Sequence, residues 1–115
     1  MNSLRNRVQL IGHLGGDPEI KTLEGSKKVA RFSLATNDEY TDKSGQKVKQ
    51  TQWHQLVVWG RLADTCERFL FKGKEIAIEG KLTYRTWNDK DGKTHNITEV
   101  VVNELMFMGS KDKGK

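Results

Sequence analysis

The stretch Thr51-Gln-Trp-His-Gln-Leu-Val-Val-Trp59 is rich in the β-branched and aromatic residues that favour a strand. Side chains alternate between the two faces of a strand, so Trp53 and Trp59, six residues apart, lie on the same face. Leu56 and Val58 then point the other way and supply an inward face. This segment therefore predicts a half-buried strand that presents two tryptophans outward.

Four other segments alternate polar and apolar residues with the same period of two, and we interpret them as strands. They are residues 6–14, 28–36, 75–87 and 97–107. Trp87 ends the third of these on a face that also carries Lys81 and Arg85. Gly80 interrupts the apolar face of that strand, which predicts a bulge or a tight bend.

Residues 61–70 repeat their apolar side chains at helical spacing, so they predict a short amphipathic helix that Lys72 and Gly73 would end. Residues 37–50 and 88–95 are polar, and we interpret them as projecting hairpin loops, with residues 19–25 as a short excursion. Five strands with one helix between the third and the fourth is the order of an OB-fold, a Greek-key barrel. The sequence thus predicts a mainly β domain over residues 1–109 and a short, basic, disordered tail over residues 110–115.

The formal net charge of +5 favours an anionic partner. No apolar run is long enough to span a membrane, and the first residues lack the apolar core of a signal peptide. The single cysteine, Cys66, cannot form an internal disulfide, which fits a reducing cytoplasm, and its place on the helical stripe makes it a core residue rather than a nucleophile. These observations favour a cytoplasmic binding protein.

Exposed aromatic and basic side chains are the candidates for function. The aromatic candidates for stacking on unpaired bases are Tyr40, Trp53, Trp59 and Trp87. The basic candidates for phosphate contact are Arg7, Arg31, Lys43, Lys47, Lys49, Arg61, Lys72, Lys81, Arg85 and Lys93. A single tryptophan is more often a core residue and a single lysine is more often solvated, so only the placement of these residues on shared faces indicates a binding role. Stacking ignores base identity, which predicts binding without sequence preference.

The sequence offers no candidate for catalysis or for a bound cofactor. Its three histidines lack the spacing of metal ligands, and no carboxylates cluster to hold a metal. The glycine-rich stretch at residues 12–16 lacks the lysine of a phosphate-binding loop and is better read as a turn. We therefore expect no metal, no cofactor and no enzymatic activity.

Four segments in the same order resemble the bacterial single-stranded DNA-binding proteins of the tetrameric OB-fold type. They are Asn6-Arg-Val-Gln-Leu-Ile-Gly-His-Leu-Gly-Gly-Asp-Pro-Glu19, Thr51-Gln-Trp-His-Gln-Leu-Val-Val-Trp-Gly-Arg-Leu-Ala63, Ile78-Glu-Gly-Lys-Leu-Thr-Tyr-Arg-Thr-Trp87 and Thr98-Glu-Val-Val-Val-Asn103. The resemblance extends from about residue 4 to residue 109. It implies a homotetramer, built as a dimer of dimers, that coats single-stranded DNA during replication, recombination and repair in the nucleoid.

The resemblance also implies roles for individual residues. By position, the four aromatic candidates match stacking residues of the family, and the matching backbone contacts are Arg7, Lys43, Arg61, Lys72 and Arg85. His54 matches a residue near a subunit interface. The family pairs its first strands across a dimer, which would explain Ile11 on an otherwise polar face and would also involve Val8.

The chain departs from the family pattern at several positions. Tyr40 stands where many members have tryptophan, and Trp59 where many have phenylalanine, so both keep a ring. Members usually continue into a flexible linker and an acidic tip that recruits replication and repair enzymes, whereas residues 109–115 are basic, so we do not expect recruitment by that route. The alternatives are a dimeric module like the primosomal replication proteins and an OB domain that binds another protein.

Overall fold

The computed structural model describes residues 4–108. Its strands are β1 (Val8–Leu14), β2 (Glu19–Leu23), β3 (Lys27–Thr41), β4 (Lys47–Trp59), β5 (Glu75–Asn88) and β6 (Thr94–Phe107). Its helices are the 3₁₀ turn η1 (Glu24–Ser26) and the α-helix α1 (Arg61–Phe69). Residues 110–115, for which we predict a tail, lie outside the described residues.

The strands form one sheet in the order β1-β5-β6-β4-β3-β2, and β1 also pairs with β3. This last pairing, of His13 with Ala35 and Leu14 with Leu34, closes five strands into a barrel. The β4–β6 pair is parallel, and the other pairs are antiparallel. The predicted five-stranded OB barrel with a helix between its third and fourth strands is confirmed, and β2 is an extra strand outside the ring.

Two predictions about the connecting segments are wrong. Residues 19–25, expected as an excursion, contain β2, which gains its hydrogen bonds by pairing with residues 27–31 of β3. Residues 37–50, expected as a loop, are mostly strand, because β3 and β4 pair without interruption out to Thr41 and Lys47. A ribbon exposed on both faces needs no apolar side chains, so the alternation that signals a half-buried strand is missing there.

The barrel interior is filled by the inward residues of the strands and closed at one end by α1. Leu34, Leu56, Val58 and Ile76 are the large residues that are almost fully buried in the barrel wall. Cys66 of α1 is also buried, and its burial raises the pKa of the thiol to about 11. The thiol therefore stays protonated at neutral pH, as expected of a core residue.

A β-bulge bends β5 where it crosses the barrel. The register with β6 shifts between Glu79 and Gly80, as the glycine predicts. A Cβ atom at Gly80 would collide with the backbone carbonyl of Val101, so only glycine permits this approach of the two strands. Because of this bend, one half of β5 belongs to the barrel wall and the other half belongs to a projecting hairpin.

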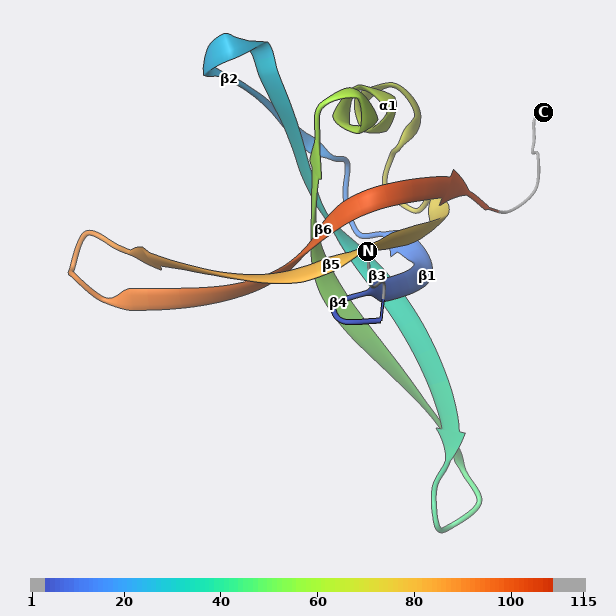
Figure 1. Ribbon diagram of the computed structural model, residues 1–115. Coiled ribbons are helices and arrows are strands. Elements are labelled where there is room, and N and C mark those ends of the chain that lie inside the picture. The colour runs from blue at the N-terminus through green and yellow to red at the C-terminus, as the bar shows by residue number, and fades with distance from the viewer. Residues whose placement is uncertain (1–3, 109–115) are drawn as a thin grey trace.

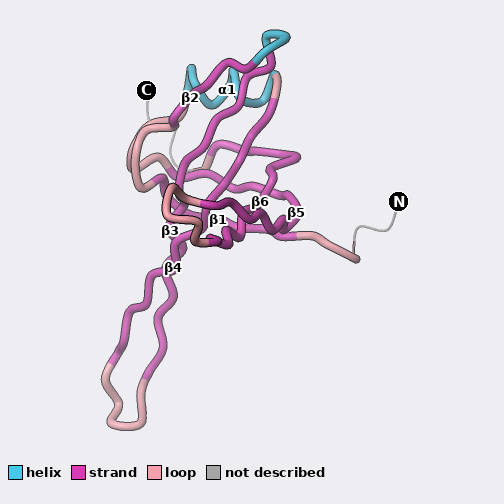
Figure 2. The backbone as a smooth tube through the Cα atoms, turned by 90° about the vertical axis from the view of Figure 1, so that its left-hand side faces the viewer, coloured by secondary structure: helices cyan, strands magenta, loops and turns pink. Residues whose placement is uncertain are grey.

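Two long hairpin arms leave the barrel in different directions (Figure 1). One is formed by β3 and β4 and the other by β5 and β6, and each is a two-stranded ribbon away from the barrel. Seen from the side, the β3–β4 arm extends away from α1, which sits at the opposite end of the molecule (Figure 2). The arms extend the surface available to a partner well beyond the barrel itself.

Candidate nucleic-acid interface

The strand register gathers the outward side chains of β3, β4, β6 and β5 on one side of the barrel. Gln55 of β4 lies beside Glu99 of β6, and Glu99 lies beside Thr83 of β5. We call this surface the tryptophan face and define it by Arg31, Trp53, Trp59, Arg85, Trp87 and Glu99. All three tryptophans predicted as stacking residues are exposed there.

Trp53 is seated on the turn that follows β1. Its side chain is 60% exposed, and its ring packs over Gly15. A Cβ atom at Gly15 would lie 2.5 Å from Cζ3 of Trp53 and 2.8 Å from Oγ of Ser33. The absence of a side chain at Gly15 therefore fixes the position of the ring while one ring face stays accessible.

Trp59 is the last residue of β4 and lies where the chain turns into α1. A groove beside it is lined by residues of β2 and η1, by Lys27 and Lys28 at the start of β3, and by Arg61 at the start of α1. Lys28 is occupied by the helix, because its Nζ atom lies 2.7 Å from carboxylate oxygens of both Asp64 and Glu67. The hydrogen bond to Asp64, followed by that to Glu67, raises the pKa of Lys28.

Trp87 lies on the β5–β6 arm directly opposite His95. The two rings are stacked, with centroids 4.4 Å apart and planes 20° apart. Nε2 of His95 is hydrogen-bonded at 2.8 Å to the carboxylate of Asp89, and this bond is the main cause of the lowered pKa of Asp89. The imidazole therefore holds the indole in place from one side.

Arg31 and Arg85 converge from β3 and β5 on Glu99, which is only 7% exposed. Oε2 of Glu99 accepts hydrogen bonds of 3.0 Å from Nη1 of Arg31 and from Nη2 of Arg85. Oε1 accepts a third, of 3.3 Å, from Nε of Arg85. The pKa of Glu99 is lowered, first by the hydrogen bond from Arg85 and also by the charges of both arginines, so this carboxylate is ionised at neutral pH.

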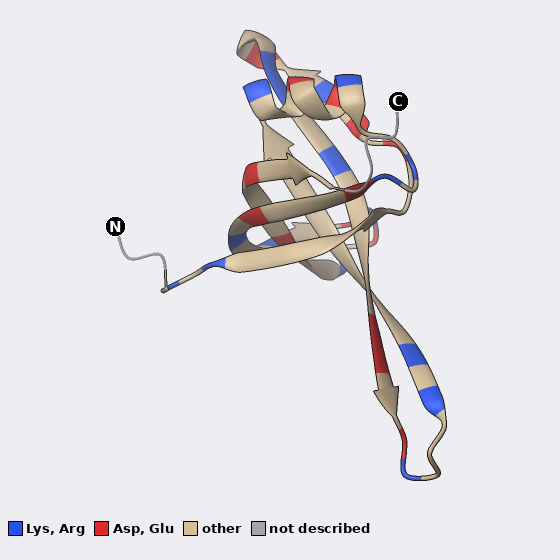
Figure 3. Ribbon diagram, turned by 90° about the vertical axis from the view of Figure 1, so that its right-hand side faces the viewer, with Lys and Arg blue, Asp and Glu red and all other residues tan. Residues whose placement is uncertain are grey.

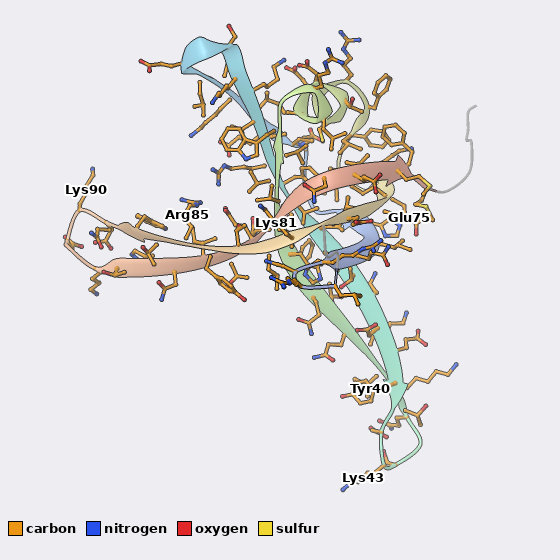
Figure 4. All side chains as sticks on the ribbon, in the orientation of Figure 1. Tyr40, Lys43, Glu75, Lys81, Arg85 and Lys90 are labelled. Carbon is orange, nitrogen blue, oxygen red and sulfur yellow. The ribbon has the colours of Figure 1, made fainter. Side chains whose placement is uncertain are left out.

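The β3–β4 arm carries Tyr40 and Lys43 near its tip (Figure 4). Lys49 lies on the same arm, opposite Glu39. Tyr40 has the strand parity of Leu34, so it lies on the other face of the ribbon from Trp53. Lys47 and Lys49 both lie on β4. Figure 3 shows basic bands on one strand of this arm and an acidic band on the other. The sequence-predicted aromatic set is thus divided between the barrel and an arm.

Lys81 of β5 shares the tryptophan face with Arg85, and the remaining basic candidates lie around this face rather than on it. Arg7 precedes β1 and forms an ion pair of 2.9 Å with Glu79 of β5, the strand that pairs with β1. Arg61 begins α1, Lys72 lies in the loop after α1, and Lys81 follows the bulge in β5 opposite Val101. Of these residues, Arg61 lines the same groove as Trp59.

The residues predicted at subunit contacts lie elsewhere. Val8 and Ile11 are on β1, whose residues 8–12 pair with β5 on one edge and, among the described residues, with no strand on the other. The Ile11 side chain is exposed on the outside of the sheet. His54 is half-buried and shares a hydrogen bond of 2.9 Å with Oγ1 of Thr36.

Sequence reasoning assigned no binding role to Gly15, His95 or Glu99. The signal for His95 is its symmetric position with Trp87 about the Asp91-Gly92 turn, which makes them cross-strand neighbours. The signal for Glu99 is a lone acid within an apolar strand, but its partners depend on the register of three strands. The packing of Trp53 over Gly15 has no signal in the sequence beyond the turn that contains this glycine.

The sequence profile of the Single-strand binding protein family matches residues 5–108. The chain belongs to this family. It is 44% identical over 110 residues to Single-stranded DNA-binding protein 1 of Chlorobaculum tepidum, covering 95% of this chain and 68% of the relative. It is 40% identical over 107 residues to Single-stranded DNA-binding protein 1 of Xylella fastidiosa, covering 92% of this chain and 79% of the relative.

Solved structures of family members have the same fold. A Plasmodium falciparum SSB in complex with single-stranded DNA superposes with a TM-score of 0.84 at 34% identity, covering 90% of this chain and 95% of the other. A deletion variant of the single-stranded DNA-binding protein from Thermus aquaticus gives a TM-score of 0.79 at 32% identity, covering 92% of this chain and 51% of the other.

Within residues 4–108, no group of three or more His, Cys, Asp or Glu side chains is arranged to hold a metal ion. Over the same residues, no helix has the length and hydropathy to cross a membrane.

Proposed function

We propose that this protein binds single-stranded DNA without sequence preference. The observation that carries the proposal is the continuous outer surface shared by Trp53, Trp59 and Trp87. Flat exposed rings bind bases only when the bases are unpaired, because a duplex buries their faces. Membership of the single-strand binding protein family and the likeness to an SSB solved with single-stranded DNA support the same reading.

Base stacking on the tryptophan face supplies the sequence-independent part of the affinity. Each stacked base contributes about 1–3 kcal/mol, and every base has a ring face to offer. Trp53 on Gly15 and Trp87 on His95 are each held from one side, so little freedom is lost when a base covers the other side. The rings thus act as prepared platforms.

Basic side chains around the face neutralise the phosphates. In this proposal the contacts come from Arg7, Arg31, Lys43, Lys49, Arg61, Lys72, Lys81 and Arg85, with Tyr40 adding a ring on the β3–β4 arm. Each phosphate contact on a single strand steepens the dependence of log affinity on log salt by about 0.7. Binding should therefore weaken as salt increases.

The free edge of β1 supports assembly with other copies of the chain. Pairing of this edge with its symmetry mate would form a dimer around Val8 and Ile11, with His54 near the contact. Ile11 and Met106 are exposed beside a groove of about 440 Å³ on the outside of β1, β5 and β6, which suits the stacking of two dimers into a homotetramer. Sedimentation equilibrium tests this, and a stable dimer would instead favour the primosomal type of module.

The role that fits this activity is protection of DNA strands exposed in replication, recombination and repair. The protein would act in the cytoplasm, at the nucleoid, and by binding alone, without a catalytic step. The test of the underlying activity is a titration with poly-dT that follows tryptophan fluorescence at low and high salt. We expect strong quenching, and tighter binding at low salt, because the bases cover the indoles.

Two variants sharpen this titration. Trp53→Ala should weaken binding to every single strand by a similar factor, whereas Trp53→Phe keeps a ring and should retain most of the affinity. Duplex DNA should bind far more weakly than a single strand of the same length. Unchanged affinity in Trp53→Ala, or equal affinity for the duplex, would rule out stacking on this face.

A further inference from the structure

Glu99 is an acid at the centre of a surface whose other charged groups are basic. It sits on β6, between β4 and β5, with Arg31 and Arg85 on either side. A surface that only attracted phosphate would gain nothing from a carboxylate there, because the carboxylate cancels one of the two guanidinium charges. Its position therefore calls for an explanation in terms of which nucleic acid the surface accepts.

We propose that Glu99 is a specificity-determining residue that keeps the phosphates of a duplex off the centre of the tryptophan face, so that single strands are preferred over duplexes. The proposal rests on the proposed binding of single-stranded DNA to that face. A single strand that stacks on Trp53 and Trp87 directs its neutral bases toward Glu99, and its flexible backbone can bend down to Arg31 and Arg85 beside the carboxylate. A duplex cannot offer its base faces for stacking, because its bases are paired and stacked, so it approaches this surface with its phosphate backbone.

The ion-pair geometry also restrains the two arginines. Arg31 gives one guanidinium nitrogen to Glu99, and Arg85 gives two, so both head groups lie against the sheet instead of reaching outward. Their side chains are 37% and 42% exposed, respectively. A flexible strand can follow the surface down to them, whereas a rigid duplex cannot. Glu99 thus disfavours a duplex in two ways. Its carboxylate repels the phosphates, and its hydrogen bonds keep Arg31 and Arg85 from reaching them.

Glu99→Gln is the sharpest test, because it removes the charge while preserving much of the geometry. The two 3.0 Å hydrogen bonds both end on Oε2, so the single carbonyl oxygen of glutamine can still accept them. Removal of the Glu99 charge leaves one guanidinium charge without a counter-charge, which allows about one more phosphate contact with a duplex. Each such contact steepens the dependence of log affinity on log salt concentration by about 0.9. That slope corresponds to roughly eightfold tighter duplex binding at about 0.1 M salt.

The measurement is the dissociation constant for a labelled single strand and for a duplex of the same length, over a range of salt. We expect Glu99→Gln to tighten duplex binding by about eightfold and to change single-strand binding by less than about twofold. Equal tightening of both, no change in either, or weaker single-strand binding would overturn the proposal. Glu79→Gln is the matched control, since Glu79 pairs with Arg7 outside the tryptophan face and should leave the ratio unchanged.

Arg31→Gln provides a second test that does not depend on the folding of Glu99→Gln. It leaves the carboxylate with one arginine, so the centre of the tryptophan face becomes more repulsive to phosphate and duplex binding should weaken more than single-strand binding. An equal loss for both ligands would contradict the proposal. The wild-type protein separates the two hypotheses. If it fails to bind the single strand, the proposed function is wrong. If it binds the single strand and the variants leave the ratio of duplex to single-strand affinity unchanged, only the role of Glu99 is refuted.

Discussion

The β3–β4 arm and the β5–β6 arm end in turns of the same design. In each tip an aspartate, Asp42 or Asp89, accepts hydrogen bonds of 2.9 Å on Oδ1 from the backbone N–H groups two and four residues later. Gly45 and Gly92 follow three residues after these aspartates with φ values of 85° and 83°. The tips therefore need the same residue types, aspartate first and glycine where φ is positive.

The arms differ in how their exposed side chains are held. On the β5–β6 arm, Trp87 is stacked on His95 and Arg85 is paired with Glu99. On the β3–β4 arm, none of the ring contacts and ion pairs within residues 4–108 involves Tyr40, Lys43 or Lys49. The difference indicates that one arm contributes a prepared stacking platform, whereas the other contributes solvated side chains, among them Tyr40, Lys43 and Lys49.

The largest effect is expected at Trp87. Trp87→Ala should weaken binding to a dT oligomer by about 5- to 150-fold, the equivalent of one lost stack of 1–3 kcal/mol. The loss should be similar at low and high salt, because stacking involves no counterion release. Anisotropy titrations of a labelled oligomer measure both quantities.

Tyr84→Ala is the control on the same arm. Tyr84 is the most exposed ring of the described aromatic residues, at 75%, but it has the opposite strand parity from Trp87 and so faces away from the tryptophan face. Its removal should leave the affinity unchanged. A loss as large as that of Trp87→Ala would show that exposure, and not the shared face, decides which rings bind DNA.

A smaller, salt-dependent effect is expected at the tips. Lys43 and Lys90 occupy the same position after the turn aspartate, yet Lys90 is flanked by Asp89 and Asp91, whereas Lys43 lies on an arm with Lys47 and Lys49. Lys43→Gln should lower the salt slope by about 0.7 and weaken binding about fivefold at about 0.1 M salt.

Lys90→Gln should change the affinity less than about twofold, because its neighbours already repel phosphate. The same anisotropy titrations, repeated over a range of salt, measure both lysine variants. Equal effects of the two substitutions would show that the arms carry equivalent phosphate contacts, and the contrast between them would then be wrong.

The tryptophan face could be predicted from the sequence because strand alternation is a local property. Trp53 and Trp59 are on the same face at any register, and the placement of Trp87 with Arg85 requires only that strand. The fold followed from the order of the strands and the helix. The polar ribbon of the β3–β4 arm and β2 escaped prediction because cross-strand pairing, and not an apolar face, forms them.

The ionic and ring contacts of the site could not be predicted because they depend on long-range register. Glu99 contacts residues 68 and 14 positions away, on two different strands. The stack of His95 on Trp87 requires the turn between them to contain the right number of residues. Alternation assigns a side chain to a face, but only the register decides its neighbours.

The smallest expected effect is a change in folding stability at the two hairpin tips, and it depends on pH. The pKa of Asp42 is lowered, first by the hydrogen bond from Ser44, and the pKa of Asp89 is lowered, first by the hydrogen bond from His95. A carboxylate with a lowered pKa stabilises the folded state above its unfolded pKa, near 3.8, and loses this contribution as the pH falls through the folded value.

Asp42→Asn and Asp89→Asn should therefore each lower the melting temperature by about 1–4 °C near neutral pH, and the deficit should shrink as the pH falls below about 4. Asp89→Asn should cost more, because it also releases His95 from the carboxylate and loosens the seat of Trp87. Thermal melts by circular dichroism from neutral to acid pH measure this, with Asp38→Asn as the control on the β3–β4 arm. Equal losses of melting temperature in Asp42→Asn and Asp89→Asn would show that the contact of His95 with Asp89 does not stabilise the tip. The held side chains that distinguish the β5–β6 arm would then depend on the Arg85–Glu99 pair alone.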